Sequence, residues 1–88
     1  MVYLVMFTKN IVNQNDVRIT DNYPIDHSPG HVHVSSKNHP PTRIGPNGYP
    51  LKGNRIMTPQ ENNVFWENIK IIRKVIKKAQ KFIKRLPW

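Results

Sequence analysis

The last third of the chain constrains the fold most, because it joins a helix start to a single apolar stripe. Thr58 can cap a helix, Pro59 suits the first helical position, and Glu61 completes a capping box. Apolar residues then recur in steps of four and three: Phe65, Ile69, Ile72, Ile76, Ala79, Ile83 and Leu86. The next proline is Pro87. The pattern predicts one long helix over about residues 59–85.

The first two thirds of the chain carries strand and turn signals instead. Apolar or alternating runs predict strands at residues 2–7, 17–20 and near 31–36. The Pro40-Pro41 pair predicts a loop around residues 35–41, and Asn47-Gly48 predicts a tight hairpin turn. A chain of 88 residues forms one domain at most. We therefore expect a single α+β domain over residues 1–88, in which strands and hairpins of residues 1–56 form a small antiparallel sheet against the C-terminal helix.

The charge of the chain narrows the class of partner. Lysine and arginine number 14 against 5 acidic residues, which gives a net charge of +9. Such a balance predicts an anionic partner: a nucleic acid, an acidic protein or an anionic membrane. Much of the charge lies in the second half of the predicted helix, where we expect Lys74 and Lys78 to contact phosphates. The chain has no cysteine, which excludes disulfides and thiolate chemistry.

Three of the four histidines lie within seven residues, in the stretch Asp26-His27-Ser28-Pro29-Gly30-His31-Val32-His33-Val34. Its last four residues alternate as a strand does, so His31 and His33 should share one face while the valines face the core. Histidine is the side chain whose ordinary pKa lies nearest neutrality, so it suits both proton transfer and metal binding.

These residues can supply the groups that metal-free RNA cleavage requires. A base must take the 2′-hydroxyl proton, an acid must protonate the leaving 5′-oxygen, and cations must neutralise the phosphorane. We predict His31 and His33 as the acid and base, with His27 in reserve and Asp26 favouring a protonated histidine. The predicted phosphate-binding residues are Arg43, Lys52 and Arg55.

A metal site is the competing interpretation of the same histidines. His27, His31 and His33 could be three ligands, with Asp26 as a fourth ligand or as a residue that orients them. The spacing matches no established zinc signature, so the preferred prediction is a site without metal or other cofactor.

The histidine stretch resembles the D-H-x-P-x-H-V-H-V signature of small bacterial toxin-like domains, with Gly30 where proline is common. The continuation is similar to the C-terminal toxin domains of bacterial polymorphic toxins, through Thr42-Arg43-Ile44-Gly45, Asn47-Gly48, Pro50-Leu51-Lys52-Gly53 and the long helix. The resemblance covers about residues 23–88; residues 1–22 match nothing in it.

The resemblance implies a toxin that is delivered from the producing bacterium, acts in the cytoplasm of a target cell and is neutralised by a cognate immunity protein. Ribonuclease activity is the expectation for small basic toxins of this kind, and the immunity protein or antitoxin should be acidic. Two alternatives stay open. One is a non-catalytic module that binds nucleic acid or protein; the other is a membrane-active basic helix, although we expect no stable membrane association.

Overall fold

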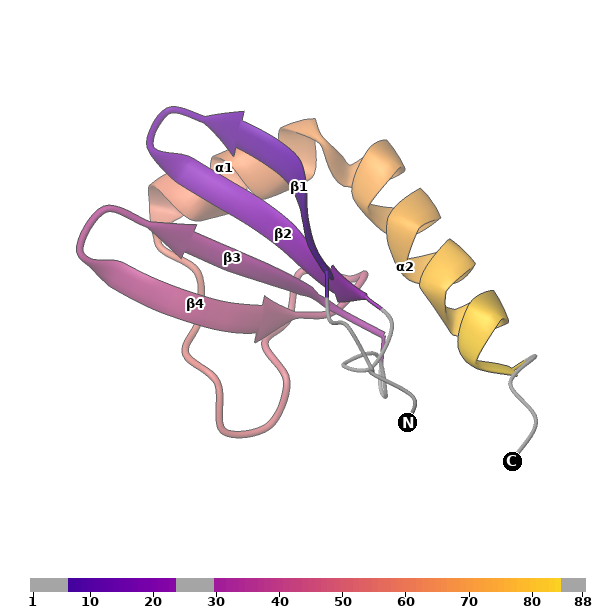
Figure 1. Ribbon diagram of the computed structural model, residues 1–88. Helices are drawn as coiled ribbons and strands as arrows, with labels where there is room; N and C mark the ends of the chain where they lie inside the picture. Colours follow the sequence, from indigo (N-terminus) through magenta and orange to yellow (C-terminus); the bar gives the residue numbers. More distant parts are fainter. Residues whose placement is uncertain (1–6, 24–29, 85–88) are drawn as a thin grey trace.

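The computed structural model is an α+β fold in which four antiparallel strands and two helices form two layers (Figure 1). It describes the backbone of residues 7–23 and 30–84, and the side chains of residues 9–21 and 30–78. The strands follow one another across the sheet in chain order. They are β1 (Phe7–Gln14), β2 (Val17–Tyr23), β3 (Val32–Ser36) and β4 (His39–Ile44). The helices are α1 (Pro59–Glu67) and α2 (Ile69–Lys84).

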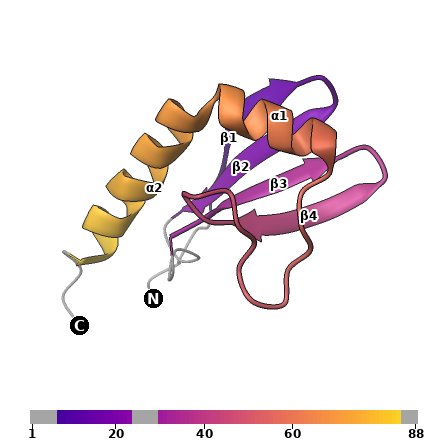
Figure 2. The same cartoon turned by 180° about the vertical axis from the view of Figure 1, so that it is seen from behind.

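The two helices lie on one side of the sheet and leave the other side without a helix, as the front and back views show (Figures 1 and 2). The valines of β3 and Ile19 of β2 point to the helices and are fully buried. They pack with Phe65 of α1 and Ile72 of α2 in one hydrophobic core. Burial of each such side chain contributes about 1.5–3 kcal/mol. The core therefore fixes which side of β3 faces away from the helices.

The predicted loop around residues 35–41 is wrong, because β4 begins at His39 and pairs with β3. Lys37 and Asn38 form the two-residue turn, with Asn38 at a φ of 67°. Strand β4 lies at the edge of the sheet, where a proline that cannot donate a hydrogen bond is tolerated. The register also shifts between Val34 and Ser36, opposite the two prolines. Edge position and bulge together explain why Pro40-Pro41 does not end the strand.

The single long helix predicted for residues 59–85 is also wrong, because the helix is broken at Asn68. The Asn68 side chain donates to the carbonyl of Val64 at 2.8 Å and to Gln14 Oε1 at 3.4 Å. Asparagine competes for backbone groups in this way, which disfavours it inside helices. The predicted start is confirmed: the Thr58 hydroxyl accepts from Glu61 N–H, and Glu61 accepts from Thr58 N–H.

A buried ion pair joins the segment after β4 to the start of α1. Arg55 Nη1 and Nη2 lie 2.8 and 2.9 Å from the two carboxylate oxygens of Glu61, whose side chain is fully buried. Ser36 of β3 donates a further hydrogen bond to Glu61. Burial opposes ionisation of Glu61, but the hydrogen bonds from Arg55, from Thr58 N–H and from Ser36 outweigh it and lower the pKa of this carboxyl. The same hydrogen bond to Glu61 raises the pKa of Arg55.

The predicted first strand, residues 2–7, lies outside the described residues except for Phe7, which begins β1. Within the described part of the chain, neither helix is long and apolar enough to cross a bilayer.

Candidate functional site

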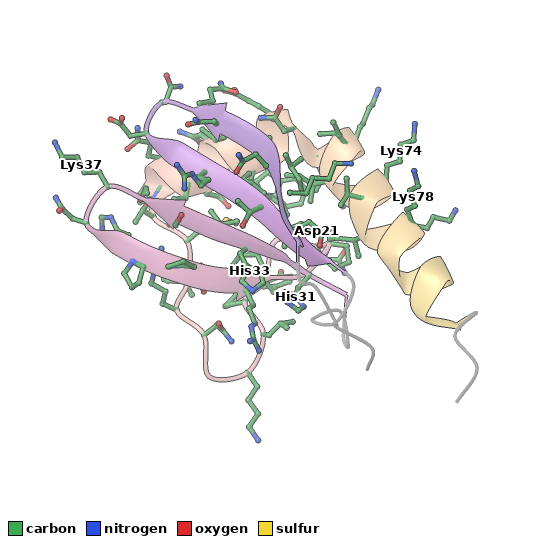
Figure 3. The ribbon with its side chains drawn as sticks, viewed as in Figure 1. Asp21, His31, His33, Lys37, Lys74 and Lys78 are labelled. Atoms are coloured by element: carbon green, nitrogen blue, oxygen red, sulfur yellow. The ribbon has the colours of Figure 1, made fainter. Side chains whose placement is uncertain are left out.

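The rings of His31 and His33 pack against each other on the side of the sheet that the helices leave uncovered (Figure 3). Their centroids lie 5.1 Å apart and their planes are inclined by 82°, an edge-to-face arrangement. The alternation of β3 produces this pair, because Val32 and Val34 point into the core and His33 points away from it. The sequence thus correctly predicts that the two histidines share a face.

A row of side chains crosses the sheet at His33. Thr20 of β2 is the cross-strand partner of His33 on one side, and Arg43 of β4 is its partner on the other. Directly opposed residues in an antiparallel pair project to the same face, with Cβ atoms about 4.5–5.5 Å apart. Thr20 is buried, whereas Arg43 is exposed. Register therefore places an arginine, a side chain whose geometry suits phosphate binding, beside the histidine pair.

The backbone of Arg43 is fixed by the loop that follows its strand. Its N–H donates to Asn54 Oδ1 at 3.1 Å, and its carbonyl accepts from Leu51 N–H at 2.9 Å. The Asn54 side chain also donates to the carbonyl of Lys52 at 3.3 Å. Asn54 thus links two of the predicted phosphate-binding residues, Arg43 and Lys52, through their backbones. The side chains of Arg43 and Lys52 both lie exposed near this loop.

The two histidines differ in how much of the side chain is exposed to solvent. His31 is 1% exposed, whereas His33 is only partly buried. A group that transfers protons to RNA must reach within hydrogen-bond distance of the reacting atom. Of the two, His33 keeps part of its side chain exposed, although its Nδ1 is buried, so a substrate would have to be reached through Nε2. The buried His31 ring can position the His33 ring through the edge-to-face contact.

A third predicted phosphate-binding residue, Arg55, uses its guanidinium for hydrogen bonds within the protein. Its five N–H groups have acceptors in the carbonyls of Pro40 and Ile56 and in the carboxylate of Glu61. We therefore assign Arg55 to the attachment of the loop to α1 and leave it out of the candidate site.

Two other predicted phosphate-binding residues lie away from the histidine pair. Lys74 and Lys78 are exposed on α2 and project away from the sheet, far from the labelled histidines in Figure 3. Asp26 and His27 lie outside the described residues, and the metal alternative depends on both. Within the residues that the structure describes, no group of three or more histidine, aspartate or glutamate side chains is placed to hold a metal ion.

Two residues at the site were not predicted. Thr20 and Asn54 owe their positions to strand register and loop closure, which a single sequence does not encode in any local pattern. The alternation of Val17-Arg18-Ile19-Thr20 is the one available signal, because it puts Thr20 on the polar face of its strand.

Comparisons of the chain with protein-family models, with curated proteins and with solved structures find no match in any of the three.

Proposed function

We propose that the chain is a bacterial toxin domain that cleaves RNA without a metal ion and is held in check by an acidic immunity protein. The observation that supports this most is the cross-strand pairing of His33 with Arg43 beside the His31 ring. It brings a histidine, the residue type whose ordinary pKa lies nearest neutrality, next to a permanent cation on the side of the sheet away from the helices. The net charge of +9 favours a polyanionic substrate.

The proposed reaction is transesterification at phosphorus. The 2′-oxygen attacks the adjacent phosphorus as His33 removes its proton, and the bond from phosphorus to the 5′-oxygen breaks. The products are a 2′,3′-cyclic phosphate and a 5′-hydroxyl, whose proton comes from water. Arg43 neutralises the developing phosphorane charge through its guanidinium, which matches phosphate in geometry. His31 is a positioning residue in this scheme, because its ring is 1% exposed.

Product analysis tests the proposal. The purified chain is incubated in EDTA with a single-stranded RNA and with its 2′-O-methyl analogue. We expect fragments that end in 2′,3′-cyclic phosphate from the RNA and no cleavage of the analogue, which lacks the nucleophile. Cleavage that stops in EDTA and returns with one added metal, or cleavage of both strands, would contradict the mechanism.

The second candidate is a non-catalytic RNA-binding module, and the burial of His31 favours it. A buried imidazole can serve packing alone, with the histidine pair as a structural part of the sheet. Binding of RNA with no fragments, at any pH from 5 to 8 where histidine changes charge, would select this candidate.

A further inference from the structure

We infer that the turn after β4, residues 45–49, and the exposed face of the helices form a subsite for single-stranded RNA. In this subsite Tyr49 stacks on an unpaired base and Arg73 binds the adjoining phosphate. This subsite is separate from the histidine pair. It rests on the proposed function only in taking RNA as the ligand.

The backbone of the turn packs closely against the Trp66 side chain of α1 at Gly48. Gly45 N–H donates to the carbonyl of Tyr49 at 2.9 Å, and Gly48 N–H donates to the carbonyl of Gly45 at 3.1 Å. Gly48 has a φ of +82°, and a Cβ there would lie 2.8 Å from Trp66 Cζ2. The indole is itself oriented by its Nε1–H, which donates to Asn62 Oδ1 at 3.2 Å. Trp66 therefore fixes the turn on the helix.

Arg73 of α2 is held to the same turn. Its Nε donates to the carbonyl of Pro46 at 3.0 Å, and its Cζ lies 5.7 Å from the Trp66 ring centroid, over the ring. The cation–π contact and this hydrogen bond fix the guanidinium plane while Arg73 remains exposed. Its terminal Nη atoms have no acceptor among the described residues, so the fork is available for a phosphate.

Tyr49 supplies the stacking surface. It lies in the turn that Trp66 and Arg73 hold, and it is 75% exposed. A tyrosine this exposed gains little from packing, and aromatic rings next to cations are the recurring elements of single-strand binding sites. Every base has a flat apolar face, so such a site tolerates many sequences but needs the base to be unpaired.

The charges around the turn suit a nucleic-acid strand. Lys70, Arg73 and Lys77 follow one another on α2 in steps of three and four, and all three are exposed. Such steps place side chains along one face of a helix, so a strand held at Tyr49 and Arg73 meets a run of cations. Glu67, the nearest acidic residue in sequence, accepts a hydrogen bond from Gln14 of β1 instead.

The test measures binding to a 2′-O-methyl oligoribonucleotide of about ten nucleotides, which the proposed reaction cannot cleave, as a single strand and as a duplex. We expect Tyr49→Leu to weaken single-strand binding about tenfold and Tyr49→Phe to leave it nearly unchanged. Duplex binding should be weaker than single-strand binding in the wild type and insensitive to either change. Equal affinities of the Leu and Phe variants would overturn the inference, as would a tyrosine dependence seen only with vesicles of anionic phospholipid.

Arg73→Gln is compared with Lys37→Gln, which removes one charge at the β3–β4 turn, at the far end of the sheet in Figure 3. The arginine variant should lower the dependence of log affinity on log salt by roughly 0.7, the value for one phosphate contact on a single strand, and the lysine variant should leave it unchanged. Equal slopes in the two variants would contradict the Arg73 contact.

Failure of this inference is distinguishable from failure of the proposed function. If the wild type cleaves RNA but Tyr49→Leu and Tyr49→Phe bind the oligonucleotide equally well, the proposed subsite is wrong and the histidine site stands. If no RNA is cleaved but binding depends on the Tyr49 ring, the subsite stands and the catalytic proposal is wrong.

Discussion

His33 of β3 lies directly opposite Arg43 of β4, and both alternate along their strands with residues that are buried toward the helices. The pairing depends on register alone, because a shift of one residue would bring a core-facing residue of β4 opposite His33. The register is fixed from both sides. Val32 pairs with Ile44 and Val34 with Thr42 toward the core, while Asn54 holds the backbone of Arg43 from the loop.

The ion pair between Arg55 and Glu61 should dominate the acid sensitivity of the fold. Glu61→Gln leaves the Arg55 guanidinium, 27% exposed, without its charged partner, and removal of one partner from a buried pair costs about 3 kcal/mol. Because the pKa of Glu61 is lowered in the folded state, the unfolded chain binds the proton first as the pH falls. Wild-type stability should therefore fall with pH below about 5, and this slope should flatten in Glu61→Gln.

Urea unfolding between neutral pH and pH 3 measures both effects. Glu67→Gln is the control, because Glu67 is an exposed carboxylate on the same helix. A loss of stability in Glu67→Gln as large as in Glu61→Gln would contradict the assignment, and so would an unchanged acid slope in Glu61→Gln.

Alanine substitutions at Gly48 and at Gly53 distinguish the effect of backbone strain from the effect of the contact with Trp66. Their φ angles are +82° and +84°, so alanine is strained at either position by about 1–2 kcal/mol. Only at Gly48 would the new Cβ meet Trp66; at Gly53 it has no neighbour within 4 Å. Gly48→Ala should therefore lower stability more than Gly53→Ala and also weaken single-strand binding. Equal unfolding midpoints and equal binding in the two variants would show that the Trp66 contact does not hold the turn.

Much of the fold follows from local patterns in the sequence. The capping box at Thr58, the alternation at residues 31–34 and the Asn47-Gly48 turn are each formed by neighbouring residues, and the structure contains all three. The two errors have long-range causes. Asn68 ends a helix partly through Gln14, 54 residues away, and the prolines of β4 are tolerated because tertiary structure puts that strand at the edge.

The same division holds for the candidate site. The shared face of His31 and His33 follows from residues two apart, and was predictable. The burial of His31, the pairing of His33 with Arg43 and the engagement of Arg55 by Glu61 all depend on strand register or on how the loop closes. No local pattern carries that information, so these features came only from the structure.

His31 is expected to act through His33 rather than on the substrate. His31→Phe keeps an aromatic ring at the edge-to-face contact and removes both nitrogens; urea unfolding checks that the variant is folded. We expect cleavage to fall about tenfold, below the hundredfold or greater loss typical of a lost general base, and the midpoint of the rising limb of the pH–rate profile to move. A profile and a rate identical to wild type would show that His31 only fills space.

If the chain is neutralised by an acidic immunity protein, as proposed, that protein should cover the exposed side chain of Arg43. Opposite fields raise association rates above the range of about 10⁵–10⁶ M⁻¹s⁻¹ that is found without them. Stopped-flow association of the proposed immunity protein with this chain should slow steeply with salt, because exposed charges are screened beyond about 8–10 Å. Arg43→Gln should slow association more than Lys37→Gln. A partner that is itself basic, or a rate that does not change with salt, would count against this.

Single-turnover cleavage of a single-stranded RNA by His33→Asn and by His39→Asn measures whether His33 acts as the base in the proposed reaction. His39 is the matched control, because it is an exposed histidine at the β3–β4 turn whose Nδ1 contacts the carbonyl of Lys37 and the hydroxyl of Ser36. We expect His33→Asn to lower the rate by about a hundredfold or more, while His39→Asn cleaves RNA as the wild type does and both variants stay folded. Wild-type cleavage by a folded His33→Asn protein would contradict it.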